Sequence, residues 1–541
     1  MKTMMRVRMP QTGPALSPKD EPAGGSLSKA VFLHLDGKRQ EALKELRDAA
    51  ARGERQPQLF SAAAHIEYEL GAFEEAVESY RRLLELEPEH RTGHFNRAVC
   101  LGRLGRWAEA AEGFEAALRL DPSRDEAHLG LGTCLIHLER ADDAVRVFNS
   151  YLIRFPDDEE ALFGKAVAMQ IACRFDEAAE MYQKILVNNP RSEQCLTNLV
   201  AMHLARQDYA KLRDCAQKLR SLSIDSQTAL EALATAAFAE KDFAAAAAYA
   251  KRLTELFPDQ FENWFNLGVA CQKLERYGEA VDAHTHAVTL KPDSPQALLD
   301  LGVAHQKMGS LGAARAAFER ALELAPNLAG AMWNLALVLE QLGERAKAEE
   351  LYGQLPEDKP ESEDAIFRLG YLRLLRGDFT GSAKAFAACL QKRPGWQEAQ
   401  LNAAIANWRA SNIPAAHEFF EKVLAANPNS PDALRGLAAL ALEEQEWPRA
   451  FDLHRRLLDI GERGAELYYN IGLICQKRNQ ASESVLYYQE ALKQNPGFAE
   501  ALLNLGHAMR SLGKEEEARA CWQRAIAVRP ELAASYFEPG S

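Results

Sequence analysis

The sequence lacks three features that would assign it to a familiar class: a long apolar run, a disulfide framework and an excess of basic residues. No stretch of 18 residues is apolar and free of charge, so we expect no membrane insertion. Nine cysteines scattered among 541 residues are too few for a disulfide framework, and we expect them to act as small buried hydrophobes. Lys and Arg total 64 against 77 for Asp and Glu, and this formal net charge of -13 argues against nucleic acid as the main partner.

Catalytic and metal-binding motifs are also missing. The sequence has no His-Glu-x-x-His, no Cys-x-x-Cys and no glycine-rich loop after a predicted strand. His284 and His286 are two residues apart, so on a helix they point to different sides and do not predict a metal site. We therefore expect no enzyme activity, no cofactor and no metal.

The first 22 residues have the composition of a flexible polar tail. Lys2, Arg6 and Arg8 could begin a signal peptide, but Pro10 and Pro14 interrupt the apolar core that must follow. The missing signal and the isolated thiols favour a reducing, cytoplasmic location.

A period of 34 residues runs through the rest of the chain. If each proline on this period is position 32 of a repeat, residues 23–532 divide into 15 repeats and leave a stub at 533–541. Position 8 is Gly or Ala in fourteen repeats, and position 20 is Ala in twelve. The prolines on the period are Pro88, Pro122, Pro156, Pro190, Pro258, Pro292, Pro326, Pro360, Pro394, Pro428, Pro496 and Pro530.

Within a repeat, apolar positions 4, 7 and 11 share one helical face, and positions 20, 24 and 27 share the face of a second helix. Small residues at positions 8 and 20 let the two backbones approach closely. The pattern resembles the tetratricopeptide repeat family. This resemblance implies an all-α fold, a right-handed superhelical solenoid of about 15 helix-turn-helix repeats, whose first helices line a concave groove that binds protein partners.

Some repeats depart from the pattern. In 193–226 and 227–260, Leu212 replaces the small residue, Ile224 replaces the proline, and alanines fill 244–248. This divergence is either ordinary drift or a hinge between 57–192 and 261–532. In repeat 329–362, Leu355-Pro356 predicts that the second helix ends early. Tyr536 and Phe537 would cover the apolar face of the last repeat.

Position 6 of the first helix is the main candidate for binding. The resemblance places it on the concave wall, and an Asn amide can bond to a peptide backbone without reading its sequence. The row, with Asp300 between two of its asparagines, resembles the asparagine ladder in the repeat arm of O-linked N-acetylglucosamine transferases. It is interrupted by Gly130, Gly164, Ala232, Arg368 and Gly436. Asparagine is also frequent at this position in the family. The row is therefore either a peptide-binding track or a residue preference common to the family. The row consists of Asn96, Asn198, Asn266, Asn334, Asn402, Asn470 and Asn504.

Positions 5 and 2 add aromatic and acidic side chains beside this row. The aromatic residues include Phe265, Trp333, Phe367 and Tyr469, and they either anchor a ligand or pack between successive first helices. Acids at position 2, such as Asp364 and Glu398, favour neutral or basic segments and argue against an acidic C-terminal peptide as ligand.

These patterns predict a non-enzymatic scaffold or adaptor that binds other proteins or extended peptides, with its main site within 261–504. Two alternatives remain. One is an accessory arm that presents substrates to a separate enzyme such as a glycosyltransferase. The other is a structural scaffold that self-associates through its ends.

Overall fold

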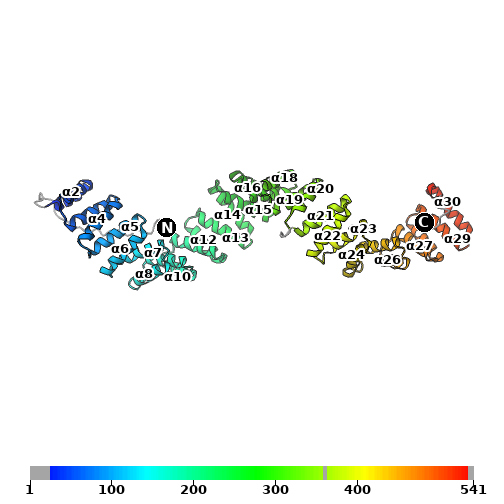
Figure 1. Cartoon of the computed structure of the whole chain (residues 1–541), viewed down its shortest axis with the longest axis horizontal. Coiled ribbons are helices and arrows are strands. Elements are labelled where there is room, and N and C mark those ends of the chain that lie inside the picture. Colours follow the sequence, from blue (N-terminus) through cyan, green and yellow to red (C-terminus); the bar gives the residue numbers. More distant parts are fainter. Residues whose placement is uncertain (1–24, 357–361, 534–541) are drawn as a thin grey trace. The chain divides into compact units, whose positions relative to one another are not determined.

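The computed structural model describes residues 25–356 and 362–533, and helices account for its regular structure (Figure 1). These residues form 30 α-helices and one 3₁₀ helix, with no strand among them. The predicted all-α fold with about 15 helix-turn-helix repeats is confirmed. The tail at 1–22 and the proposed cover by Tyr536 and Phe537 lie outside the described residues. No helix in the described ranges is both long and apolar enough to cross a membrane.

The chain divides into two compact halves, residues 1–270 and 271–541, and we describe each half separately. The helices that begin in the first half are α1 (Ser26–Leu35), α2 (Arg39–Ala51), α3 (Pro57–Glu69), α4 (Phe73–Leu86), α5 (Arg91–Arg103), α6 (Trp107–Leu120), α7 (Asp125–His137), α8 (Ala141–Leu152), α9 (Glu159–Ile171), α10 (Phe175–Asn188), α11 (Glu193–Ala205), α12 (Tyr209–Leu222), α13 (Gln227–Ala239), α14 (Phe243–Leu256) and α15 (Phe261–Lys273).

The helices of the second half follow the same alternation. They are α16 (Tyr277–Leu290), α17 (Pro295–Lys307), α18 (Leu311–Leu324), α19 (Ala329–Gln341), α20 (Arg345–Gln354), α21 (Ser362–Arg376), α22 (Phe379–Lys392), α23 (Gln397–Arg409), α24 (Ile413–Ala426), α25 (Pro431–Glu443), α26 (Trp447–Asp459), α27 (Ala465–Lys477), α28 (Ala481–Gln494), α29 (Ala499–Ser511), α30 (Glu515–Val528) and the 3₁₀ helix η1 (Pro530–Ala533). Helix α20 has 10 residues where α18 and α22 have 14, so the predicted early end is confirmed.

One left-handed residue links the two helices of a repeat. Where this residue is glycine, as at Gly105 (φ 75°) and Gly343 (φ 82°), the conformation carries no Cβ penalty. Other repeats use the same conformation without glycine, for example Glu139 (φ 57°) and Gln445 (φ 60°). The turn geometry is therefore set by the packing of the hairpin and not by glycine alone.

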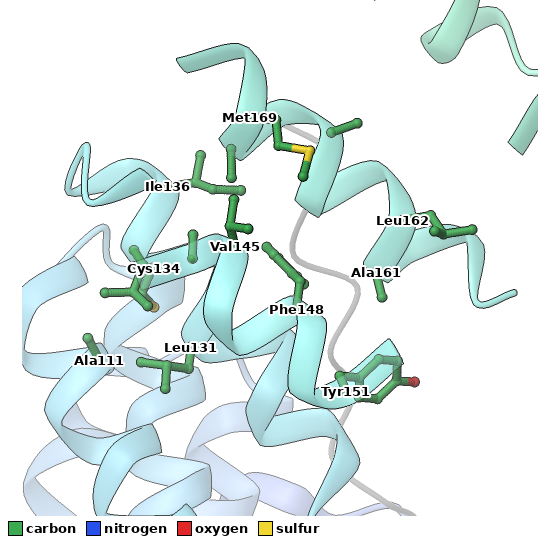
Figure 2. Packing of buried hydrophobic residues seen from close by; sticks show 14 of the residues in the cluster. Ala111, Leu131, Cys134, Ile136, Val145, Phe148, Tyr151, Ala161, Leu162 and Met169 are labelled. Atoms are coloured by element: carbon green, nitrogen blue, oxygen red, sulfur yellow. The ribbon is translucent and has the colours of Figure 1, made fainter. Parts of the chain in front are cut away.

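Position 24, on the second helix of each repeat, is closely packed. We call it the ring position. Figure 2 shows one example, Phe148 of α8, among the core side chains Val145, Ile136 and Met169. The ring position holds a buried aromatic residue in ten repeats. Phe148, for example, lies against Gly132 on the first helix of its own repeat and against Gly164 on that of the next. The ten are Tyr80, Phe114, Phe148, Tyr182, Phe318, Tyr352, Phe386, Phe420, Tyr488 and Trp522.

In the divergent repeat 193–226, large and small side chains have exchanged places at this contact. In repeat 193–226, the ring position is the small Ala216, while Leu212 and Val200 are large where other repeats have Ala, Gly or Ser. Leu212 is completely buried and Val200 is 3% exposed, so both fill space that an aromatic ring occupies elsewhere. Repeat 227–260 shows no such exchange, because Ala234, Ala246 and Ala250 occupy the same three positions.

Candidate binding groove on the first helices

The seven asparagines at position 6 all lie on first helices, but their amides differ in their hydrogen-bond partners. Asn96 donates from Nδ2 to the hydroxyl of Tyr80 at 3.1 Å, and Asn198 donates in the same way to Tyr182 at 3.0 Å. Each bond joins a first helix to the ring of the preceding repeat. Burial raises the pKa of both tyrosines, so the hydroxyls stay protonated and accept the amide N–H. These two asparagines are parts of the repeat interface.

Two further asparagines also bond within the chain. Asn504 donates from Nδ2 to the Tyr469 hydroxyl at 3.0 Å, and Asn334 donates to the backbone carbonyl of Gly330 at 2.7 Å. The remaining three, Asn266, Asn402 and Asn470, make no hydrogen bond to other described residues. The predicted row is therefore not a continuous track of available amides.

The ring position also explains three interruptions of the row. A Cβ on Gly130 would lie 2.5 Å from Cζ of Phe114, which is the ring of the preceding repeat. Gly164 and Gly436 meet Phe148 and Phe420 in the same way. Glycine at position 6 makes room for these rings. A phenylalanine at the preceding ring position does not by itself predict this glycine, because Phe318 and Phe386 precede Asn334 and Asn402.

The predicted aromatic residues at position 5 are half-buried and contact other rings. Trp333 lies 5.6 Å from Tyr352 and Tyr469 lies 5.8 Å from Tyr488, centroid to centroid, and both partners are ring-position residues of the same repeat. Phe265 stacks on Phe261 at 5.5 Å. One side of each of these rings thus packs against another ring of the chain. Because each side chain is only half-buried, part of it remains accessible.

One groove in the second half brings together three of the predicted residues. Trp333 of α19, Phe367 of α21 and Asn402 of α23 line a cavity of about 530 Å³. Six more side chains complete its lining, namely Glu340, Asp364, Arg368, Tyr371, Trp396 and Glu398. We call this cavity the α19–α23 groove. Phe265, Tyr469 and the other six asparagines of the row do not line it.

The aromatic wall of the groove is built from rings that contact one another. Phe367 stacks on Trp396 at 4.5 Å with 20° between the planes, and it meets the ring-position residue Phe386 edge-on at 5.5 Å. The guanidinium of Arg393 lies 4.8 Å from the Trp396 centroid. Tyr371 is 42% exposed beside these rings. Tyr371 and Trp396 were not predicted from the sequence, because neither lies at position 2, 5 or 6 of a repeat.

The single guanidinium among the lining residues is already paired. Nη1 of Arg368 donates to both carboxylate oxygens of Glu340, at 3.2 and 3.1 Å, and the guanidinium lies 6.0 Å from the Trp333 centroid. Glu340 also accepts the Tyr352 hydroxyl at 3.1 Å. Burial, together with this carboxylate, raises the pKa of Tyr352. Arg368 is therefore held in place and its charge is compensated.

Two carboxylates of the groove have no such partner. Asp364 and Glu398 are exposed and form no ion pair with any other described residue. They lie in the first turns of α21 and α23, where the helix dipole favours a negative charge. The lining residues comprise three carboxylates and one guanidinium, which gives the groove a net charge of -2.

Comparison with known proteins identifies the repeats. Family models described as tetratricopeptide repeat match residues 61–124, 101–159, 142–193, 231–295, 306–369, 401–465, 465–498 and 487–520. The chain belongs to the tetratricopeptide repeat family. The sequence-based resemblance is thereby confirmed, and the α19–α23 groove is a surface of three successive tetratricopeptide first helices.

Individual relatives match parts of this tetratricopeptide chain. An uncharacterized protein of Methanocaldococcus jannaschii is 33% identical over 75 residues, which is 14% of this chain and 87% of that protein. Protein FlbA of Caulobacter vibrioides is 26% identical over 150 residues, and the match spans 28% of this chain and 25% of FlbA.

Solved structures share the repeat architecture at low identity. The MamA protein is 22% identical with a TM-score of 0.30, covering 32% of this chain and 96% of MamA. The structure of Naa15/Naa10 bound to HypK-THB is 13% identical with a TM-score of 0.33, covering 95% of this chain and 96% of that one. These likenesses support no conclusion about function.

Proposed function

We propose that this protein is a non-enzymatic scaffold or adaptor that binds an extended segment of a partner protein in the α19–α23 groove. The family supports the general role, because tetratricopeptide repeats bury their apolar faces against one another and present the remaining faces to partners. The observation that carries the specific site is the meeting of Trp333, Phe367 and Asn402 on one groove.

Asn402 is suited to this role because its amide is not used by the part of the chain that the structure describes. Unlike Asn96 and Asn198, it forms no hydrogen bond to other described residues, so both its donor and its acceptor are available to a peptide backbone. The rings of Phe367 and Trp396 beside it supply apolar surface for a ligand side chain. Backbone hydrogen bonding next to an aromatic wall is a common way of binding an extended segment.

A test would select binders to the purified full-length chain from a displayed library of short random peptides and measure their affinity by fluorescence anisotropy. The variant Phe367→Ala/Asn402→Ala should bind the selected peptides about tenfold more weakly or worse, since a central aromatic anchor typically contributes more than 1.4 kcal/mol. Asn470→Ala is the matched control, because it removes an unbonded amide from the same row outside the groove.

The circular dichroism spectra of the three proteins must match at the assay temperature, so that lost binding is not lost folding. Failure to select any peptide, or equal affinity for wild type and the groove variant, would contradict the proposed site.

A further inference from the structure

The two unpaired carboxylates give the α19–α23 groove a more specific chemistry than peptide binding in general. Asp364 comes from α21 and Glu398 from α23, and both line the same cavity as Phe367. Neither has a cationic partner among the described residues, whereas Glu340 holds Arg368 through two hydrogen bonds. The groove thus presents negative charge to a ligand, and this charge comes from two neighbouring first helices.

We propose that the α19–α23 groove binds an arginine or lysine side chain of the partner segment, with its cation at the carboxylates of Asp364 and Glu398. This inference rests on the proposed function and names the ligand chemistry of the same site. The charge balance of the lining residues, three carboxylates against one guanidinium, disfavours an acidic or phosphorylated segment.

The aromatic wall fits the rest of such a side chain. Arginine and lysine carry apolar stems that pack on rings while the charged group stays in contact with water or carboxylates. Phe367 and the half-exposed Tyr371, which line the same cavity as the two acids, offer surface for the stem. The protein already places its own guanidinium groups against neighbouring rings here, with Arg393 on Trp396 and Arg368 near Trp333.

Asn402 completes the arrangement. It lies one turn after Glu398 on α23, so its amide and that carboxylate lie on the same side of the helix. A segment whose cation reaches Glu398 therefore brings its backbone close to the Asn402 amide. Together these groups select an extended segment that carries a positive charge.

The test uses the peptides selected on the full-length chain, with each arginine or lysine in turn replaced by glutamine. At one position the replacement should weaken binding to the wild-type chain by about tenfold. The variant Asp364→Asn/Glu398→Gln should weaken the parent peptide to a similar extent, and the two changes together should cost little more than either alone. Glu466→Gln removes an exposed carboxylate from the same repeat position outside the groove, and it should leave affinity unchanged.

Charge reversal provides a readout that simple loss of structure cannot mimic. The variant Asp364→Lys/Glu398→Lys should reject the parent peptide and bind the form with glutamate at the critical position. Peptides that need Phe367 but no cation would overturn this inference and leave the proposed function intact. Peptides that bind independently of Phe367 and Asn402, or the absence of any binder, would contradict the inference and the proposed function together.

Discussion

At the scale of single residues, the ring position contributes to the choice of side chain at position 6 of the next repeat. Phe114 and Phe148 are followed by glycine, which makes room for the ring. Tyr80 and Tyr182 are followed by asparagines that donate to their buried hydroxyls. Asparagine also follows two phenylalanines, Phe318 and Phe386, so the ring accounts for only part of the row.

Adding one methyl group at this contact should destabilise the protein. In Gly130→Ala, the new Cβ would lie 2.5 Å from Cζ of Phe114, so the ring or the helix must shift, and we expect a loss of about 1–3 kcal/mol. Gly312→Ala on α18 is the control, because a Cβ there meets no atom within 4 Å. Thermal unfolding measures both, and Phe114→Leu should partly rescue Gly130→Ala. Equal stability of the two glycine variants would contradict this account.

The two kinds of asparagine at position 6 should respond differently to removal. Asn198→Ala leaves the buried Tyr182 hydroxyl without its donor and should cost about 1 kcal/mol. Asn402→Ala breaks no hydrogen bond to a described residue and should change stability by less than about 0.5 kcal/mol. Chemical denaturation of the two variants beside wild type checks this. A destabilised Asn402→Ala would show that this amide is structural.

Buried histidines at two ring positions should make the protein sensitive to acid. Burial lowers the pKa of His284 from 6.5 to about 4, and burial also lowers the pKa of His454. Below pH 6.5 the unfolded chain binds protons that the folded chain does not, so this contribution to stability is lost as the pH falls toward 4.

The variant His284→Phe/His454→Phe removes both titrating groups and keeps a ring of the kind found at Phe318 and Phe386. Its melting temperature should therefore fall less than that of wild type between pH 7 and pH 4. The comparison cancels the titration of groups common to both proteins. Parallel pH profiles would rule out a role for these histidines.

At the scale of helices, the weakest hairpins should be those that lack a ring. Helices α12 and α14 have Ala216 and Ala250 at the ring position, and small side chains bury less apolar surface than an aromatic ring. Leu212 restores part of the missing volume in repeat 193–226, whereas repeat 227–260 has Ala246 at the same position.

Hydrogen exchange should therefore show lower protection in 193–260 than in 125–192. The reason is that local opening exposes less apolar surface in the repeats without rings. Introducing Ala250→Phe together with Ala234→Gly, which makes room as Gly132 does for Phe148, should raise protection locally. Uniform protection across these repeats would end the hinge hypothesis for 193–260.

At the scale of the whole molecule, charge should govern how partners arrive. The chain has a formal net charge of -13, and the α19–α23 groove has the same sign. The association rate of a cationic peptide should fall by about tenfold or more as salt screens this attraction, with a smaller change in the dissociation rate. Stopped-flow fluorescence at several ionic strengths measures both rates. A salt-independent association rate would argue that the acids do not contribute to recognition.

The sequence by itself determined the architecture. Fifteen repeats on one period, with small residues at fixed positions and prolines at the boundaries, allow little besides stacked helical hairpins, because a single hairpin cannot bury its apolar face. The early end of α20 followed from Leu355-Pro356 in the same way, since proline cannot continue a helix. These features depend on contacts within a repeat or between neighbouring repeats, and such contacts are local in sequence.

Only the tertiary structure decided which side chains remain available for binding. Asn198 and Asn402 occupy the same repeat position, yet one amide is bonded to Tyr182 and the other bonds to no described residue. Trp396 and Tyr371 joined the groove although no sequence pattern marked them. The physical reason is that availability depends on the ring one repeat earlier and on the side chains of three first helices at once, which no single position in the sequence records.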